Sequence, residues 1–283
     1  MVINWYPGHM AKAKRQITEQ LKLIDVVIEV LDARIPYSSR NPDISSFVKD
    51  KHHIIVLNKA DLADCTITDE WEKMYKDKYG IEAVSVNAVN GDGIKGLLQY
   101  LREVRDEISG IRAKKGLLAR PVRVMVLGIP NVGKSKLINR IAGINKARVE
   151  NRPGVTHSLS WLRLKNNIEL MDTPGLLWPK QNDRNVGINL ALTGTINPNI
   201  VDVYELSLHL INKLLEIKPA AFVDRYAVSD SKVPEDVFFD IADKRGCKLK
   251  GGEIDFERTS KLILNDFQTG KLGRISLERP EWF

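Results

Sequence analysis

Short, nearly continuous apolar runs recur through the first part of the chain and predict buried strands. They cover residues 26–31, 53–57, 83–86 and 122–127, and two further strands, in which polar residues interrupt the apolar ones, are predicted at residues 159–164 and 167–171. Runs of this length without alternation are typical of parallel strands that are covered on both faces. The last two strands are separated only by the polar pair Lys165-Asn166, which predicts a turn between them.

Helical periodicity fills the segments between these runs. In residues 10–23, Met10, Ile17 and Leu21 recur on one side while lysines occupy the others. Further helices are predicted at residues 43–51, 68–78, 94–108 and 134–141, and the polar residues 109–119 are expected to form a connector. Strands that alternate with helices predict the α/β class, with a mostly parallel sheet and helices on both faces.

The pattern changes after residue 178. Helices are predicted at residues 201–217, 220–226, 234–245 and 257–269, and no strong strand is expected there. The sequence therefore predicts two domains, an α/β domain at residues 1–178 and a smaller, all-α C-terminal domain at residues 179–283.

Composition narrows the class of protein. A hydrophobic fraction of 43% and a charged fraction of 28% in 283 residues are those of a soluble globular protein. We see no apolar run of membrane-spanning length and no signal-peptide pattern. Two cysteines, Cys65 and Cys247, do not make a disulfide framework. We expect a cytoplasmic protein that needs no membrane and is monomeric when free.

A phosphate-binding loop follows the strand predicted at residues 122–127. The segment Gly128-Ile-Pro-Asn-Val-Gly-Lys-Ser135 has the P-loop pattern and opens a predicted helix. Its backbone N–H groups, including those of Asn131, Val132 and Gly133, are expected to surround the phosphates of a nucleotide. Lys134 is expected to reach the β- and γ-phosphates, and the Ser135 hydroxyl to bind magnesium.

A guanine-specificity motif ends the strand predicted at residues 53–57. In Asn58-Lys-Ala-Asp61, Asp61 can accept from N1–H and N2–H₂ of guanine, and the Lys59 stem can pack along the base. Asn58 can bind the O6/N7 edge or tie this loop to the P-loop. Asn87 and Ala88 fall where a further loop is expected to meet the guanine oxygen with its backbone.

Two further segments predict the magnesium and γ-phosphate contacts. Asp172-Thr-Pro-Gly175 follows a predicted strand, so Asp172 is expected to hold magnesium through water and the Gly175 N–H to meet the γ-phosphate. Thr156, in the loop between the P-loop and Asp172, is the candidate second hydroxyl ligand of magnesium; the alternative is an ordinary loop threonine.

The order of these motifs is inverted, because the guanine motif precedes the P-loop. This predicts a circularly permuted GTP-binding domain. Leu176 stands where many GTPases carry a glutamine that orients the attacking water. Undoing the permutation brings Trp5-Tyr-Pro-Gly-His-Met10 to the second switch in space. His9 is therefore a candidate catalytic residue, with packing at the helix start as the alternative.

The charge is uneven along the chain. Residues 112–165 hold thirteen Lys or Arg and one acid, whereas residues 180–283 hold fifteen basic and sixteen acidic residues. The excess predicts a polyanionic partner such as RNA, or else a solvated basic face. The candidate RNA-binding residues are Arg112, Lys114, Lys115, Lys146, Arg148, Arg152, Lys244, Arg245, Lys248 and Lys250.

In this order, the segments WYPGHM, DARIP, NKAD, GIPNVGKS, RPGVT and DTPG closely resemble the RbgA/YlqF family of circularly permuted GTPases. The resemblance covers about residues 5–178. It implies GTP, GDP and magnesium, ribosomal RNA and the precursor of the large ribosomal subunit as partners, and activity stimulated by that particle. It further implies His9 as the catalytic histidine and Asn131 as a residue that helps to hold a potassium ion.

Two other functions stay open at this point. One is a regulatory GTPase that acts with a tRNA or protein partner, which capture of pre-ribosomal particles would distinguish. The other is an RNA-binding scaffold with a vestigial nucleotide site, against which the intact Lys134, Ser135 and Asp172 argue.

Overall fold

The computed structural model of this 283-residue chain describes residues 15, 17–42, 44, 48, 50–143, 160–164, 167–173, 175, 184–196, 202–228 and 231–283. His9, Thr156, Leu176 and the basic residues Lys146, Arg148 and Arg152 lie outside these residues, as do most of the helix predicted at 43–51.

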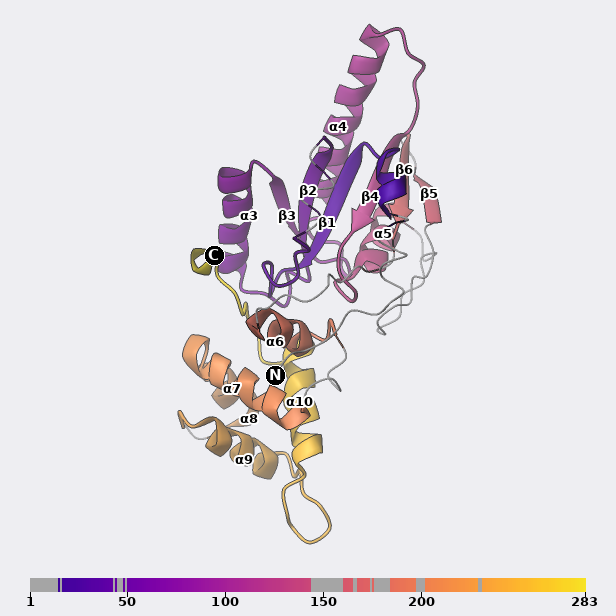
Figure 1. Ribbon diagram of the computed structural model, residues 1–283. Coiled ribbons are helices and arrows are strands. Elements are labelled where there is room, and N and C mark those ends of the chain that lie inside the picture. The colour runs from indigo at the N-terminus through magenta and orange to yellow at the C-terminus, as the bar shows by residue number, and fades with distance from the viewer. Residues whose placement is uncertain are drawn as a thin grey trace.

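The described strands form one six-stranded sheet in the order β3-β2-β1-β4-β6-β5 (Figure 1). The strands are β1 (Val26–Asp32), β2 (His52–Asn58), β3 (Glu82–Val86), β4 (Val122–Leu127), β5 (Ser160–Leu164) and β6 (Ile168–Asp172). All neighbouring pairs are parallel except β5 and β6. The mostly parallel sheet predicted from the apolar runs is therefore confirmed.

Helices cover both faces of this sheet, also as predicted. Val26, Ile28 and Val30 of β1 share one apolar cluster with α4 (Ile94–Lys114) and α5 (Lys134–Ala142). The intervening Val27 packs with Ile17, Leu21 and Ile24 from the segment before β1, of which residues 17–21 are helical. Leu31 packs instead with α3 (Cys65–Tyr79). Strand alternation thus assigns successive β1 side chains to opposite cores.

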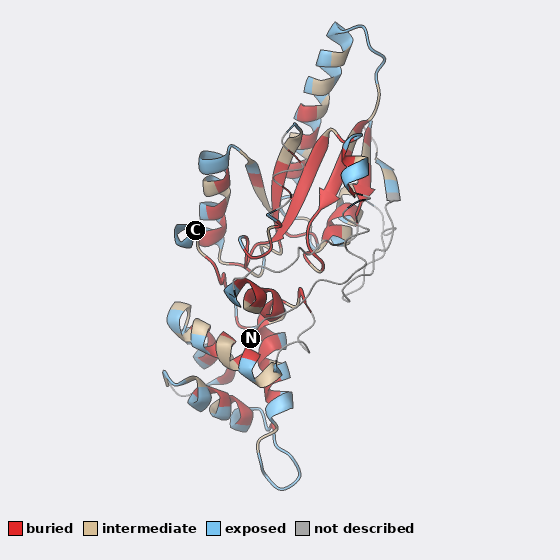
Figure 2. Ribbon diagram, viewed as in Figure 1, coloured by how far each residue is buried: buried red, intermediate tan, exposed pale blue. Residues whose placement is uncertain are grey.

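Helix α4 is longer than its pattern predicts. Residues 109–114, expected as connector, continue the helix, and its end projects beyond the sheet (Figure 1). The guanidinium of Arg112 donates to the Leu118 carbonyl at 3.1 Å (Nε) and 2.7 Å (Nη2), which folds the following turn back onto the helix. Figure 2 shows that this end is exposed. The connector is therefore an ordered tip made of residues 111–119.

The C-terminal residues form helices, as predicted, below the sheet in Figure 1. They are α6 (Arg184–Leu192), α7 (Val203–Ile217), α8 (Ala220–Tyr226), α9 (Pro234–Lys244) and α10 (Phe256–Gln268), followed by the 3₁₀ turn η2 (Pro280–Trp282). Four of these helices match their predicted positions within two residues, whereas α6 was not predicted. No described helix of the chain is long and apolar enough to cross a bilayer.

After α10 the chain returns to the α/β domain. The backbone N–H of Ile275 donates to Leu62 O and that of Leu277 to Arg34 O, each at 2.8 Å. The indole N–H of Trp71 in α3 donates to Glu278 O at 3.3 Å. Figure 1 shows the C-terminus beside α3. The last residues therefore join the C-terminal helices to the α/β sheet in space, while the predicted domain boundary at residue 178 lies outside the described residues.

A buried carboxylate secures this return. Glu278 is 1% exposed. Its oxygens accept from the backbone N–H groups of Tyr37 (2.8 Å) and Ser38 (3.1 Å), from the Ser38 hydroxyl, and from Asn189 Nδ2 of α6 at 2.9 Å. Burial raises the pKa of Glu278 against the lowering effect of these hydrogen bonds. One side chain thus satisfies donors from the α/β domain and from α6.

Removal of this carboxylate should loosen the joint between the two domains. In Glu278→Ala the backbone donors of Tyr37 and Ser38 lose their acceptor, and Asn189 Nδ2 is left with the Ser38 hydroxyl oxygen at 3.2 Å. We expect the free energy of unfolding to fall by about 3 kcal/mol, measured by urea denaturation. The control is Glu281→Ala, an exposed acid of the same segment, which should change stability by less than about 0.5 kcal/mol. Equal effects of the two variants would contradict this role.

Candidate nucleotide-binding site

The predicted nucleotide-binding residues gather at the carboxyl edge of the parallel strands. Asp32 and Asn58 are paired in register at the ends of β1 and β2, and Asp172 is paired with Val126 near the ends of β6 and β4. Ligands of open parallel sheets bind at this edge, in the crevice where connections leave in opposite directions. The motifs that are far apart in sequence therefore face one site.

The P-loop leaves β4 and enters α5 with backbone angles that favour glycine. Gly128 has φ +152° and Gly133 has φ +96°. A Cβ on Gly128 would lie 2.5 Å from Val30 O, and a Cβ on Gly133 would lie 2.4 Å from Asn58 Nδ2. The loop is therefore packed against β1 and the guanine motif as closely as glycine allows. Its last N–H groups open α5, where an anion is stabilised by the helix N-terminus.

Lys134 is buried at this helix start. Its ammonium donates to Gly128 O at 3.0 Å and to Ile129 O at 2.9 Å. Burial lowers the pKa of Lys134 to about 8, against an opposing effect of Asp172. A buried ammonium bound to two carbonyls of its own loop is poised to exchange them for phosphate oxygens. The position fits the predicted contact with the β- and γ-phosphates.

Ser135 and Asp172 lie together at the base of the loop. The Ser135 hydroxyl donates to Asp172 Oδ2 at 3.4 Å, and Oδ1 of Asp172 is buried with no hydrogen-bond partner among the described residues. Burial raises the pKa of Asp172 against the lowering effect of Lys134. A hydroxyl beside an unsatisfied carboxylate oxygen fits magnesium, which prefers hard oxygen ligands and keeps several waters.

Gly175 approaches the P-loop closely. A Cβ at Gly175 would lie 2.6 Å from the backbone nitrogen of Pro130. Gly175 therefore lies against the P-loop, as required for a residue that reports the γ-phosphate.

Asn58 ties three loops together. Its Nδ2 donates to Val132 O in the P-loop at 2.7 Å, and its Oδ1 accepts from the Ala88 N–H at 3.2 Å. Of the two predicted roles, these contacts match the tie between loops. Asn87 shapes its own loop, because its Oδ1 accepts from Val89 N at 2.8 Å.

Lys59 and Asp61 differ sharply in their surroundings. Asp61 is exposed, and its carboxylate is accessible to a base. Lys59 adopts φ +60° and directs its ammonium to Asp32 Oδ2 at 2.9 Å. The Lys59 ammonium is thus held by a buried carboxylate of β1, while 23% of the Lys59 side chain stays exposed.

The P-loop also contacts the helical domain. Asn131, which has φ +58°, donates from Nδ2 to Gly194 O at 2.9 Å, just after α6. Asn131, predicted to contact the nucleotide and to help hold potassium, thus also bonds the C-terminal domain through its side-chain nitrogen.

Three participants were not predicted as site residues: Asp32, Arg34 and Gly194. Asp32 had a signal, since it follows the apolar run of β1 and sits at the same edge as Asn58. Gly194 had none, because the contact uses its backbone carbonyl.

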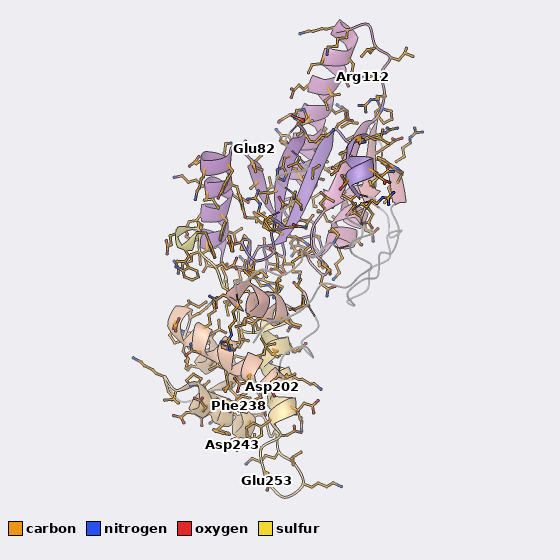
Figure 3. All side chains as sticks on the ribbon, in the orientation of Figure 1. Glu82, Arg112, Asp202, Phe238, Asp243 and Glu253 are labelled. Atoms are coloured by element: carbon orange, nitrogen blue, oxygen red, sulfur yellow. The ribbon has the colours of Figure 1, made fainter. Side chains whose placement is uncertain are left out.

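The described basic candidates form two groups at opposite ends of the molecule. Figure 3 shows Arg112 near the far end of α4 and Asp243, the ion-pair partner of Lys248 at 2.9 Å, among the C-terminal helices. Lys114 and Lys115 at the tip are exposed. Arg245 donates to Arg225 O at 2.6 Å and lies over Tyr226, so it also has a structural role. Lys244 and Lys250 are exposed.

Sheet order, P-loop, guanine motif and the segment at Asp172 together define a P-loop GTPase whose motifs are circularly permuted. A sequence profile described as "50S ribosome-binding GTPase" matches residues 123–235.

Full-length relatives agree with this class. Ribosome biogenesis GTPase A of Bacillus licheniformis is 45% identical over 284 residues, which cover 99% of each chain. The Bacillus cereus protein of the same name is 44% identical and spans 100% of this chain and 96% of its own. The GNP-bound structure of YlqF from T. maritima superposes with a TM-score of 0.66 at 31% identity over 95% of this chain and 99% of that one. The chain belongs to the ribosome biogenesis GTPase A family.

The lowered pKa of Lys134 predicts that nucleotide binding takes up a proton. Phosphate oxygens raise the pKa of Lys134 from about 8, so affinity is fully present below that pH and weakens as the pH rises above it. Proton uptake on binding should therefore increase as the pH rises through this range. Calorimetry with GDP in two buffers of different ionisation enthalpy measures it. Uptake that does not rise with pH would contradict the assignment.

Proposed function

We propose that this GTPase acts in the cytoplasm, where it binds a precursor of the large ribosomal subunit and contacts its ribosomal RNA. GTP hydrolysis then allows the protein to dissociate from the particle. Family membership supports this proposal most directly, since the relatives are named for ribosome biogenesis and the matched profile for 50S binding. The exposed cations at the α4 tip add a contact of the right sign for RNA.

We assign the nucleotide contacts as the motifs predict. Lys134 and the P-loop backbone bind the phosphates, Gly175 meets the γ-phosphate, and Asp61 with Lys59 binds guanine. Ser135 and Asp172, with Thr156, would hold magnesium, which would neutralise charge on the phosphates during transfer. Asn131 would help to hold potassium through its amide oxygen, since its nitrogen bonds Gly194 O.

Particle binding tests this function. We expect the protein to co-sediment with purified large-subunit precursors in the presence of a non-hydrolysable GTP analogue, and less so with GDP. The salt dependence should show roughly one log-log unit per phosphate contact. Binding to tRNA or to a protein, but not to the particle, would favour the regulatory alternative.

Charge reversal tests whether the exposed cations at the tip of α4 contact RNA. Lys114→Glu with Lys115→Glu should weaken particle binding and leave nucleotide affinity unchanged. The matched control is Lys95→Glu with Arg102→Glu, which reverses two exposed cations of the same helix nearer its start. Equal losses in both double variants would indicate a non-specific charge effect, and no loss in either would move the contact to the C-terminal domain.

We propose His9 as the catalytic residue that orients water, since Leu176 cannot. His9→Ala should lower particle-stimulated GTP turnover by about 10²-fold, the scale of a lost acid/base or orienting group. Affinity for GTP should change little, and the variant should stay on the particle in its GTP form. His209→Ala, on α7 in the C-terminal domain, is the control. Stimulated turnover that survives in His9→Ala would remove His9 from the mechanism.

A further inference from the structure

A buried carboxylate at the end of β1 has no function assigned by the motifs. Asp32 is fully buried and lies in register with Asn58, one residue before Lys59. Its Oδ2 accepts from Lys59 Nζ at 2.9 Å, the two atoms forming an ion pair at the edge of the guanine site. Burial would raise the pKa of Asp32, but Arg34 and Lys59 outweigh it and hold that pKa well below its usual range.

Lys59 depends on this partner for its position. Its backbone is in the left-handed region, so its side chain points in a different direction from that of a residue in the usual extended conformation. Burial lowers the pKa of the Lys59 ammonium, while the charge of Asp32 opposes that effect. Without Asp32, the cations of Lys59 and Arg34 would face each other without a counter-charge, and the long lysine stem would be expelled toward solvent.

Arg34 fixes Asp32 in turn. Its Nε donates to Asp32 Oδ1 at 2.9 Å and its Nη2 to Oδ2 at 2.7 Å, a two-pronged contact that sets the plane of the carboxylate. The Arg34 guanidinium lies 5.3 Å from the ring centroid of Phe267 in α10, and its carbonyl accepts from Leu277 N. The carboxylate that meets Lys59 is therefore clamped by a residue that the C-terminal domain holds.

We propose that Asp32 is a positioning residue of the guanine site: it holds the Lys59 ammonium so that the lysine stem lies across the plane of the base. The proposal rests on the assignment of Lys59 and Asp61 to guanine. Asp32 itself touches no nucleotide and acts only through Lys59.

This role differs in a measurable way from that of Asp61. The stem of Lys59 contacts a face that every purine has, so its loss weakens guanine and hypoxanthine nucleotides equally. Asp61 accepts from the 2-amino group that hypoxanthine lacks, so a displaced Asp61 weakens GDP more than IDP. The ratio of the two affinities therefore separates loss of the stem contact from a collapsed loop.

The test measures affinities of the full-length protein for GDP and IDP by competition with a fluorescent GDP analogue. Asp32→Asn should weaken both by about tenfold and leave their ratio unchanged. Lys59→Met keeps an apolar stem without the charge, and it should weaken the affinities for GDP and IDP to a similar extent. Because this variant retains the buried Asp32, it tests the role without removing a buried acid. In the Lys59→Met background, Asp32→Asn should add less than twofold, because the two residues act through one contact.

A matched control lies on the same strand. Glu29 is equally buried and its carboxylate is bonded to His53 at 3.1 Å, on the part of β1 away from the guanine motif. Glu29→Gln should leave both affinities unchanged even where it lowers stability.

Each other result has a definite meaning. A wild-type protein that binds GDP no better than ADP would overturn the guanine site itself. With that preference intact, unchanged affinities in both Asp32→Asn and Lys59→Met, or a selective loss of GDP over IDP, would overturn only the role of Asp32.

Discussion

The binding site depends on the side-chain amide of Asn58. Its nitrogen donates to the carbonyl of Val132 and its oxygen accepts from the N–H of Ala88, so one planar group fixes the distance between the phosphate loop and both base loops. A nucleotide bridges the same loops, and a site held at the right separation before binding loses less conformational entropy on binding. The contact is possible only because residue 133 is glycine, since a Cβ there would overlap the amide.

The C-terminal domain is attached to the same loops. Asn131 of the P-loop donates to Gly194 O, Leu62 after the guanine motif accepts from Ile275, and Ser276 Oγ accepts from Asp64 N at 3.1 Å. These contacts reach phosphate and base loops from two separate parts of the helical domain. Short hydrogen-bonded paths therefore link the helical domain both to the phosphate loop and to the loop after the guanine motif.

The sequence predicts the sheet and its motifs because buried parallel strands and glycine-rich loops have local signatures. The sequence-based prediction fails where burial or a long-range hydrogen bond determines the structure, because neither leaves a pattern in the neighbouring residues. Helix α6 was missed because Val186, Asn189 and Leu192 are all buried, so no polar face marks a helical period. The sequence predicts a connector at the tip of α4 because Ser109 and Gly110 are weak helix formers, while the Arg112 contact with Leu118 that orders the end is not visible in a pattern.

The site residues divide in the same way. Lys134, Ser135 and Asp172 belong to motifs whose chemistry dictates their spacing, and the structure brings them together. Residues that are distant in sequence or lie on the neighbouring strand decide whether Asn58 contacts the base or a loop. They also decide which group pairs with Lys59. Periodicity and motif spacing contain no information about such contacts.

Stability does not explain why the chain keeps an ion cluster of Asp32, Arg34 and Lys59, in which Asp32 and Arg34 are buried. Apolar residues of similar volume are often as stabilising as a buried ion cluster, because charged groups must be removed from water. One nitrogen of Arg34 is even left buried without a partner among the described residues. What apolar residues would not provide is a fixed direction for the Lys59 side chain. A directional ionic contact, clamped by the C-terminal domain at Phe267 and Leu277, is consistent with selection for the geometry of the site over its free energy of folding.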